Sequence, residues 1–372
     1  MSVTKMNLLR NWSLAALLGS AIVCPLSALA QSASPNEERP ETPQQVTPAQ
    51  VSPAPTEADA RFTTMVVADK PMSAASSLTV REQDLRLRPI QRVSDLLRVA
   101  PGLITVQHAG GGKANQYLLR GFDADHGTDL ALTLDGIPIN MVSHAHGQGY
   151  ADSSFILPEL IERIEVFKGP YFAELGDFAT AGAINLVTKS ALPEAFVSVQ
   201  GGMYHTLRAT VAAGPSFGNV RTLIMAEGSD ADGPFDNPER YRKYNLFAKL
   251  TYDLSTRSSI SLAVSSYGGD WYASGQIPLR EVEAGRLGFF GFLDPSEGGS
   301  STRQNVYLSY QLRDAKQELT ALAYLSRYQL RLYSNFTFFA RDPIQGDGIE
   351  QSDERYLAGL RASYRRKVRI DW

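Results

Sequence analysis

The stretch IERIEVFKGPYFAELGDFATAGAINLVTK, residues 161–189, decides the fold of this chain. Residues 161–168 favour a β-strand, because β-branched and aromatic side chains occur among the charged ones. A Gly-Pro pair interrupts this strand, and Pro170 suits the first position of a short helix over residues 171–175. Small residues then lead into a second strand, residues 184–188. Two strands and a short helix within so few residues predict a compact domain of mixed α+β structure.

A second informative stretch precedes it, LRGFDADHGTDLALTLDGIPIN, residues 119–140. Within it, the runs 130–134 and 137–140 flank the pair Asp135-Gly136. An Asp-Gly pair between two such runs is a strong hairpin signal, because both residues tolerate the positive φ angles that the tight turn requires. The sequence therefore predicts a β-hairpin in the same domain.

Both stretches resemble signatures of the plug domain of TonB-dependent outer-membrane receptors. Residues 161–189 are similar to the pattern ERIEV-x-x-GP…YG…GG-x-INIVTK that closes the plug in this family, and residues 119–140 are similar to RGF…DG-x-P-x-N. The two patterns occur in the family's order, which makes the resemblance specific. One departure is residues 180–183, TAGA, which replace the usual glycine pair with other small residues. The resemblance implies a plug domain over residues 78–189.

The resemblance also implies a function and a place in the cell. It implies an α+β plug followed by an antiparallel transmembrane β-barrel in the outer membrane of a Gram-negative bacterium, with the N-terminal segment in the periplasm. The implied partners are TonB with its inner-membrane energising complex, outer-membrane lipid and an extracellular small ligand. That ligand could be a siderophore, a metal complex, a vitamin or a glycan. The alternative is a non-transporting periplasmic binding module of the plug type, or a truncated receptor.

The first 61 residues predict export and a tether. Residues 1–30 have the form of a secretory signal, because basic residues precede the apolar run 14–23 and an Ala-x-Ala cleavage site follows at 28–30. An uncleaved membrane anchor is the alternative, although the apolar run is shorter than a membrane span requires. Residues 31–61 are rich in proline and polar residues, which predicts an extended, disordered linker.

The short run FTTMVVAD, residues 62–69, follows the linker. Its position between a tether and a plug is that of a TonB box, which adds a β-strand to TonB. The alternative is that it forms the first strand of the plug. The residues expected to contact TonB are Thr63, Thr64, Met65, Val66, Val67, Ala68 and Asp69.

Beyond the plug, apolar and polar side chains alternate with a period of two, which is clearest at residues 246–254, 305–313, 319–325 and 356–364. Alternation of this kind, with short connections on one side and long ones on the other, is typical of transmembrane β-barrels. A soluble β-sandwich is the alternative. A barrel that encloses a plug needs about 22 strands, whereas residues 195–372 supply eight or nine. We therefore expect the N-terminal part of a barrel.

Composition excludes several other functions. The chain has 36 Lys and Arg against 39 Asp and Glu, a net charge of −3, which argues against a nucleic-acid partner. The only cysteine, Cys24, lies in the predicted signal, so neither disulfides nor a thiolate metal site is expected. We expect no enzyme activity and no cofactor.

The five histidines all lie between residues 108 and 205. His144 and His146 share one face if the backbone between them is extended. The loop with Asp123, Asp125 and His126 is close in sequence, and together these five residues are the predicted ligand site at the plug apex. Imidazole and carboxylate groups suit Zn²⁺, Ni²⁺ or Cu²⁺, so any metal ligands should be among the three histidines. The alternative is that these side chains bind the plug backbone or contact the barrel wall.

Overall fold

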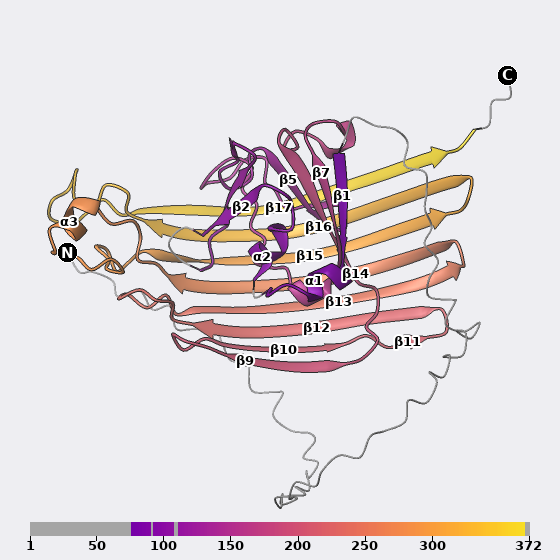
Figure 1. Cartoon of the computed structure of the whole chain (residues 1–372), viewed down its shortest axis with the longest axis horizontal. Helices are drawn as coiled ribbons and strands as arrows, with labels where there is room; N and C mark the ends of the chain where they lie inside the picture. The colour runs from indigo at the N-terminus through magenta and orange to yellow at the C-terminus, as the bar shows by residue number, and fades with distance from the viewer. Residues whose placement is uncertain (1–75, 91, 108–110, 369–372) are drawn as a thin grey trace, which may run out of the picture. The chain divides into compact units, whose positions relative to one another are not determined.

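The computed structural model describes residues 76–90, 92–107 and 111–368 (Figure 1). These residues belong to one compact unit, residues 71–372. The predicted signal peptide, the proline-rich linker, the predicted TonB box and His108 lie outside the described residues.

The sequence that decides the fold forms the centre of a five-stranded sheet in the plug. The strand order is β1-β7-β8-β5-β6, and only β5 and β8 pair in parallel. The strands are β1 (Ser76–Arg81), β5 (Leu130–Leu134), β6 (Ile137–Pro138), β7 (Ile161–Lys168) and β8 (Gly182–Thr188). The Asp135-Gly136 turn joins β5 to β6, as predicted, with both residues at positive φ.

Short elements complete the plug. They are α1 (Glu82–Arg86), α2 (Val93–Leu97), β2 (Leu103–Val106), β3 (Gln116–Leu119), β4 (Phe122–Asp123), η2 (Pro158–Leu160) and η3 (Ala173–Leu175). The helix predicted over residues 171–175 is only the 3₁₀ turn η3. Gly176 ends it at φ +78°, and so short a segment cannot repay the cost of nucleating an α-helix.

The plug has its own hydrophobic core. Its sheet buries Leu130, Ile164 and Leu186, each almost fully, in one cluster with Leu97 of α2 and Tyr117 of β3. Burial of a large aliphatic side chain is worth about 1.5–3 kcal/mol. The core therefore fixes the backbone from which the loops of the plug project.

Residues after the plug form a nine-stranded antiparallel sheet, in agreement with the predicted eight or nine strands. Its strands are β9 (Phe196–Gly201), β10 (Leu207–Ala213), β11 (Ser216–Phe217), β12 (Val220–Ala231), β13 (Tyr241–Ser255), β14 (Ser258–Tyr272), β15 (Gly298–Arg313), β16 (Gln317–Ser334) and β17 (Ile349–Arg366). Apart from β11, which pairs with β12 beside the main path, neighbours in sequence pair in space, as in a β-meander, which is not the arrangement of two packed sheets. In the part of the chain that the structure describes, the sheet does not close into a barrel, and β9 and β17 lie at its two edges.

The two faces of the sheet differ in character, and β13 illustrates this. Leu246 and Leu250 are 51 % and 48 % exposed, whereas Phe247 between them is 4 % exposed. Large apolar side chains are exposed on other strands too, among them Val199, Val211, Ile224, Leu262, Val264, Val306, Leu308, Leu325 and Leu360. An outward apolar face on long antiparallel strands is the pattern of an outer-membrane barrel wall. None of the described helices is long and apolar enough to cross a membrane.

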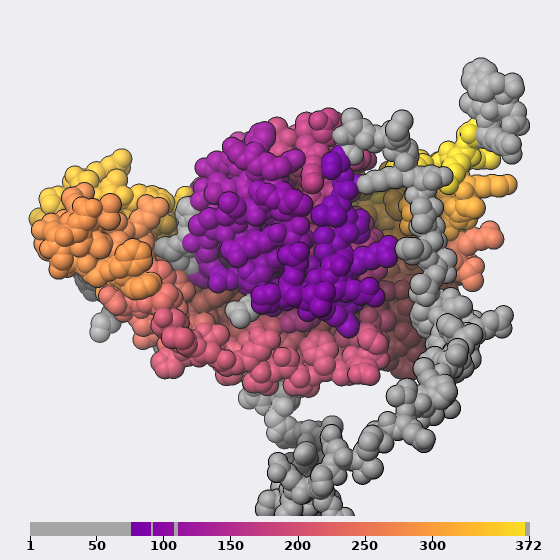
Figure 2. Space-filling view, in the orientation of Figure 1, coloured from indigo at the N-terminus to yellow at the C-terminus, as the bar shows by residue number. Residues whose placement is uncertain are grey.

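Connections between the strands fall into two classes. The turns after β13 and β15 are short, whereas the connections β12–β13, β14–β15 and β16–β17 are long. The connection β14–β15 carries the short helix α3 (Leu279–Glu283). Figure 2 shows this segment (orange) and the β16–β17 connection (yellow) together at one end of the strands. The long strands β16 and β17, at 18 residues each, exceed the segments predicted from alternation, because pairing continues toward the long loops.

Candidate functional site

The inner face of the sheet contacts the plug, and part of this contact is apolar. Ile137, Leu157 and Leu160 of the plug pack with Leu223 and Phe247 of β12 and β13 in one buried cluster. Apolar packing of this kind gives contact area but little positional specificity. Two polar clusters within the same contact fix the position of the plug relative to the strands of the sheet, which we call the wall.

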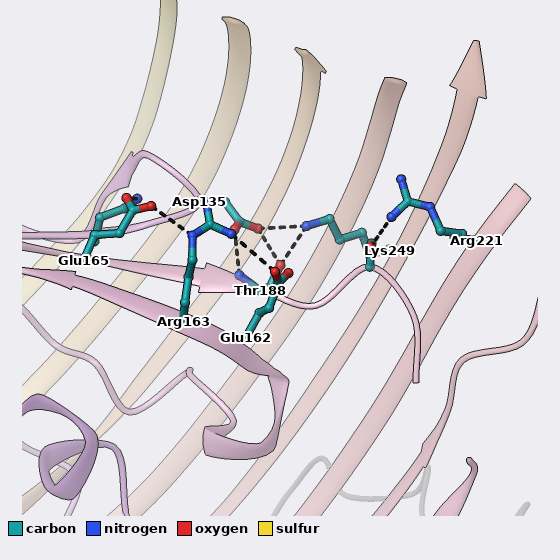
Figure 3. A network of polar contacts seen from close by, with 9 residues as sticks. Asp135, Glu162, Arg163, Glu165, Thr188, Arg221 and Lys249 are labelled. Atoms are coloured by element: carbon teal, nitrogen blue, oxygen red, sulfur yellow. Dashed lines mark hydrogen bonds and ion pairs between the residues drawn. The ribbon is translucent and has the colours of Figure 1, made fainter. Parts of the chain in front are cut away.

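The first polar cluster centres on Asp135 in the β5–β6 turn (Figure 3). Its Oδ1 accepts a hydrogen bond from the Thr188 amide at 2.8 Å, and its Oδ2 accepts one from Thr188 Oγ1 at 2.6 Å. From the wall, Tyr307 of β15 donates its hydroxyl to Oδ2 at 2.6 Å, and Lys249 Nζ of β13 lies 3.3 Å away. The Lys249 and Asp135 side chains are only 10 % and 11 % exposed. The hairpin turn therefore anchors the plug to two strands of the wall.

The second polar cluster centres on Arg208 of β10. Its guanidinium donates to both carboxylate oxygens of Glu159 in η2, at 2.6 and 2.9 Å. It also donates from Nε to Glu227 Oε2 of β12 at 2.8 Å, while Lys243 Nζ of β13 lies 2.8 Å from Glu227 Oε1. Two cations and two carboxylates thus balance in a buried setting, with the Glu227 side chain 1 % exposed. A bidentate pairing of this type is strong and geometrically specific.

Two loops of the plug carry the predicted ligand site, and Asn140 ties them together. Its Oδ1 accepts a hydrogen bond from the Leu132 amide at 2.7 Å, and its Nδ2 donates to the carbonyls of Gly127 and Gly149 at 2.9 and 3.2 Å. A Cβ on Gly127 would lie 2.4 Å from the Gly149 carbonyl oxygen, so the loops can approach this closely only with glycine there. Asn140, which ends the DG-x-P-x-N signature, thus holds the two loops of the plug apex together.

Three of the predicted site residues converge around one buried tyrosine. The rings of His126, His144 and His146 have their centroids 5.6, 4.1 and 5.7 Å from that of Tyr150. Tyr150 is fully buried, and its hydroxyl accepts a hydrogen bond from the Ala114 amide at 2.9 Å. Histidines from two separate loops are therefore brought to one place, where the His126 and His144 side chains are buried.

His126 and His146 face each other through their Nε2 atoms, which lie 3.2 Å apart. On the far side of each ring, Nδ1 of His126 lies 3.1 Å from the Asn115 carbonyl oxygen, and Nδ1 of His146 lies 2.9 Å from Gln351 Oε1. Asp125 Oδ1 lies 3.6 Å from His126 Nε2, and this carboxylate side chain is 52 % exposed. The pair therefore lies beside an exposed acidic group.

His144 has a different environment from the other two. Its ring stacks on Tyr150 with an interplanar angle of 9°, and its Nδ1 accepts a hydrogen bond from the His146 amide at 3.2 Å. Its Nε2 lies 3.9 Å from Asp353 Oδ2 of β17 and has no hydrogen-bond partner among the described residues. Asp353 also accepts a hydrogen bond from the Ala145 amide at 3.1 Å. His144 thus braces the loop against the wall.

The remaining candidates lie outside this cluster. Asp123 Oδ1 accepts hydrogen bonds from Gln116 Nε2 at 3.0 Å and from the Asp125 amide at 3.1 Å, so it shapes its own loop. His205, in the first outer turn, pairs with Asp232 at 2.6 Å and its side chain is 87 % exposed. Within the described residues, no group of three or more His, Cys, Asp or Glu side chains is arranged to bind a metal ion.

Burial controls the charge of the histidines. It lowers the pKa of His126 to about 4, and the positive charge of Lys113 lowers the pKa further, whereas Asp125 opposes the shift. Burial likewise lowers the pKa of His144 to about 4, with Asp353 opposing. Both pKa values lie well below 7, so both rings are neutral at neutral pH and each carries one N–H.

Sequence reasoning missed the wall residues that complete this cluster. Gln351 and Asp353 of β17 contact the His144–His146 loop, yet they follow it by about two hundred residues. Asn140 and Tyr150 were also not among the predicted site residues. The position of Asn140 in the recognised signature could have identified it as a residue that orders the two loops. No feature of the sequence marks Gln351 and Asp353 of β17 as their partners.

Taken together, an α+β plug that packs on the inner face of a β-sheet with an apolar outer face defines the class of plugged outer-membrane barrels. Residues 69–183 match the family described as TonB-dependent Receptor Plug Domain. The chain is 29 % identical over 263 residues to the vitamin B12 transporter BtuB of Vibrio vulnificus (strain CMCP6). The aligned region covers 67 % of this chain and 40 % of BtuB.

Solved structures agree at the level of the fold. The unliganded ferric citrate transporter FecA superposes with a TM-score of 0.65 at 16 % identity, over 80 % of this chain and 45 % of FecA. The copper transporter OprC superposes with a TM-score of 0.59 at 18 % identity, over 81 % of this chain and 43 % of OprC. The resemblance seen in the sequence is therefore confirmed. This chain carries the plug of a TonB-dependent receptor and strands of its β-barrel, and it spans less than half the length of these relatives.

Proposed function

We infer that the receptor to which this chain contributes its plug and the first strands of its barrel takes up a scarce extracellular ligand across the outer membrane. The observation that carries this proposal is the contact between the plug and a wall whose outer face is apolar. A periplasmic binding module has no use for such an apolar face, which favours the membrane receptor over that alternative. TonB and its energising complex are the proposed partners.

The proposed mechanism follows from the two polar clusters. With Asp135 and Arg208 paired as described, the plug stays on the wall and closes the route past it. A ligand bound at the apex changes the environment of the two loops tied by Asn140. Force from TonB, applied to the N-terminal segment, then separates plug and wall. Transport by this route needs no covalent chemistry, and the receptor is not proposed to be an enzyme.

The residues proposed to contact TonB are Thr63–Asp69, by addition of a β-strand to TonB. Val66→Pro removes a backbone N–H from that strand, so we expect it to abolish uptake while ligand binding at the cell surface persists. Ala54→Pro, within the proline-rich linker, is the matched control and should leave uptake unchanged. The measurement is receptor-dependent growth when iron, a transition metal, a corrin vitamin or a glycan limits growth.

The same growth measurement is repeated in cells that lack TonB. Receptor-dependent growth under at least one of these limitations should disappear both in these cells and in the Val66→Pro variant. If the Val66→Pro variant grows as well as the Ala54→Pro control, residues 63–69 are not the segment that binds TonB. Growth that persists without TonB would overturn the proposed function itself.

A further inference from the structure

The end of the wall that has the short turns carries cations that take no part in the contact with the plug. They come from the β13–β14 turn, the β15–β16 turn and the end of β17. Figure 1 shows these segments at the end of the sheet opposite α3. We call this group the basic rim, and its members are all exposed: Arg257, Lys316, Arg366 and Lys367.

Backbone hydrogen bonds hold the segments of the basic rim side by side. The Arg313 amide donates to the Arg257 carbonyl at 2.8 Å, which joins the first turn to the end of β15. The Lys367 amide donates to the Lys316 carbonyl at 2.8 Å, which joins the second turn to the end of β17. Cations that are far apart in the sequence therefore form one continuous surface.

Carboxylates near the basic rim have other partners. Asp314 Oδ1 accepts two backbone amides of its own turn, at 2.8 and 2.9 Å. Glu318 lies between two arginines on the neighbouring strands, 3.8 Å from Arg313 and 3.6 Å from Arg365. Among the residues that the structure describes, no carboxylate forms an ion pair with a cation of the basic rim. The rim therefore keeps a net positive charge.

The long connections at the other end of the wall have the opposite charge. In each of the connections β12–β13, β14–β15 and β16–β17, Asp and Glu outnumber Lys and Arg. Solvation by water alone gives no reason for the sign of the charge to differ between the two ends. The asymmetry indicates that the short-turn end meets an anionic environment.

The basic rim borders the apolar outer face of the wall. Leu250 and Tyr252 of β13 are exposed on this face, and Leu360 and Tyr364 of β17 are exposed on it as well. Arg366 shares the face of Tyr364, because side chains two apart on a strand point the same way. Aromatic rings at the border of such an apolar band typically lie at the level of the lipid headgroups. The rim is therefore placed where headgroups are expected.

We propose that the basic rim binds the anionic headgroup of a phospholipid in the periplasmic leaflet, the leaflet that the short turns of such barrels meet. Phosphatidylglycerol has the chemistry that fits, because its phosphate carries one net negative charge. The ammonium group of phosphatidylethanolamine cancels that charge. The stems of Lys and Arg lie along apolar surface while their charged ends reach the phosphate. This inference goes beyond the proposed function, since uptake of a ligand does not by itself require a particular lipid.

The experiment measures lipid binding to the receptor in a non-ionic detergent by native mass spectrometry. Phosphatidylglycerol and phosphatidylethanolamine with identical acyl chains are titrated separately. Phosphatidylglycerol should bind the parent receptor more tightly, and its advantage should shrink as the ionic strength rises, because salt screens exposed charges. Each cation near an anionic lipid surface is worth about fivefold in affinity. Loss of the whole basic rim should therefore weaken binding of phosphatidylglycerol by at least about a hundredfold.

Two variants with the same change in net charge are compared. The rim variant combines Arg257→Gln, Lys316→Gln, Arg366→Gln and Lys367→Gln. Its matched control removes exposed cations from the long connections at the other end, by Arg240→Gln, Arg280→Gln, Arg286→Gln and Arg341→Gln. Exposed substitutions of this kind should leave the folded barrel intact on heat-modifiability gels. The control should bind phosphatidylglycerol as tightly as the parent receptor does.

Equal affinity of the parent receptor for the two lipids would overturn the proposal, and this comparison needs no variant to fold. Equal losses of affinity in the rim variant and its control would overturn it as well. Inorganic phosphate or polyglutamate is then added as a competitor at the concentration of the lipid. Displacement of phosphatidylglycerol by either would identify a surface for soluble anions and refute the assignment to lipid. None of these measurements involves TonB or the transported ligand, so their failure leaves the proposed function standing.

Discussion

Asp135→Ala is expected to weaken the attachment of the plug to the wall by about 3–5 kcal/mol, the usual cost of removing one partner from a buried ion pair. The alanine leaves the Lys249 ammonium, 10 % exposed, without its carboxylate, and the Tyr307 hydroxyl without its acceptor. The Thr188 amide and hydroxyl lose their acceptor as well. Four contacts depend on one side chain, so this variant should have the largest effect.

The effect of Asp135→Ala is measured by amide hydrogen exchange in the plug of the detergent-extracted receptor. Amides of β5, β6 and β8 should exchange faster, and cells should become permeable to antibiotics too large for ordinary porins. Glu162→Ala is the matched control, because Glu162 forms an ion pair with Arg163 whose side chains are 49 % and 37 % exposed. Such pairs contribute about 0–1 kcal/mol. Equal exchange rates in the two variants would contradict the assigned role of the turn.

Arg208→Met is expected to destabilise the same contact by a similar amount, about 3–5 kcal/mol. It removes the guanidinium that pairs with both Glu159 of the plug and Glu227 of the wall. Glu227, whose side chain is 1 % exposed, then keeps Lys243 and the Asn245 amide as partners, and Glu159 loses both of its hydrogen bonds to the arginine. The measurement is the midpoint of urea unfolding of the plug, followed by exchange of the amides around η2.

A charge-balanced variant tests whether the Arg208 effect comes from a stranded charge. Arg208→Met combined with Glu159→Gln leaves Glu227 and Lys243 as a complete pair, so it should recover most of the stability. Arg242→Ala is the control, since Arg242 and Asp230 form a pair with side chains 61 % and 44 % exposed. If the combined variant is no more stable than Arg208→Met, the loss of stability comes from the lost packing of the arginine side chain and not from an unpaired charge.

The sequence was sufficient to predict the elements of the fold but not the contacts between them. The period-two alternation predicted the strands because one face of the wall exposes apolar side chains and the other meets the plug. The Asp135-Gly136 pair predicted the β5–β6 hairpin because its backbone requirement is local. That the same aspartate binds Lys249 and Tyr307 could not be predicted, because these partners follow it by more than a hundred residues.

The candidate site shows the same limit. The spacing of His144 and His146 predicted that these two would share a face, and they do lie in one cluster. The close pair is instead His126 with His146, because Asn140 draws the two loops together and Gln351 turns the second ring. Composition indicates which side chains can bind a metal, whereas loop packing decides which nitrogens meet.

Energy coupling through residues 63–69 is the central claim, and disulfide formation with TonB tests it most directly. The single cysteine of the chain, Cys24, lies in the predicted signal, so Val66→Cys adds the only cysteine beyond it. One cysteine is introduced on the edge strand of the periplasmic domain of TonB, and cells are treated with a mild oxidant. We predict a receptor–TonB disulfide with Val66→Cys and none with Ala54→Cys in the linker. Equal yields from both positions, or no adduct from either, would contradict the account.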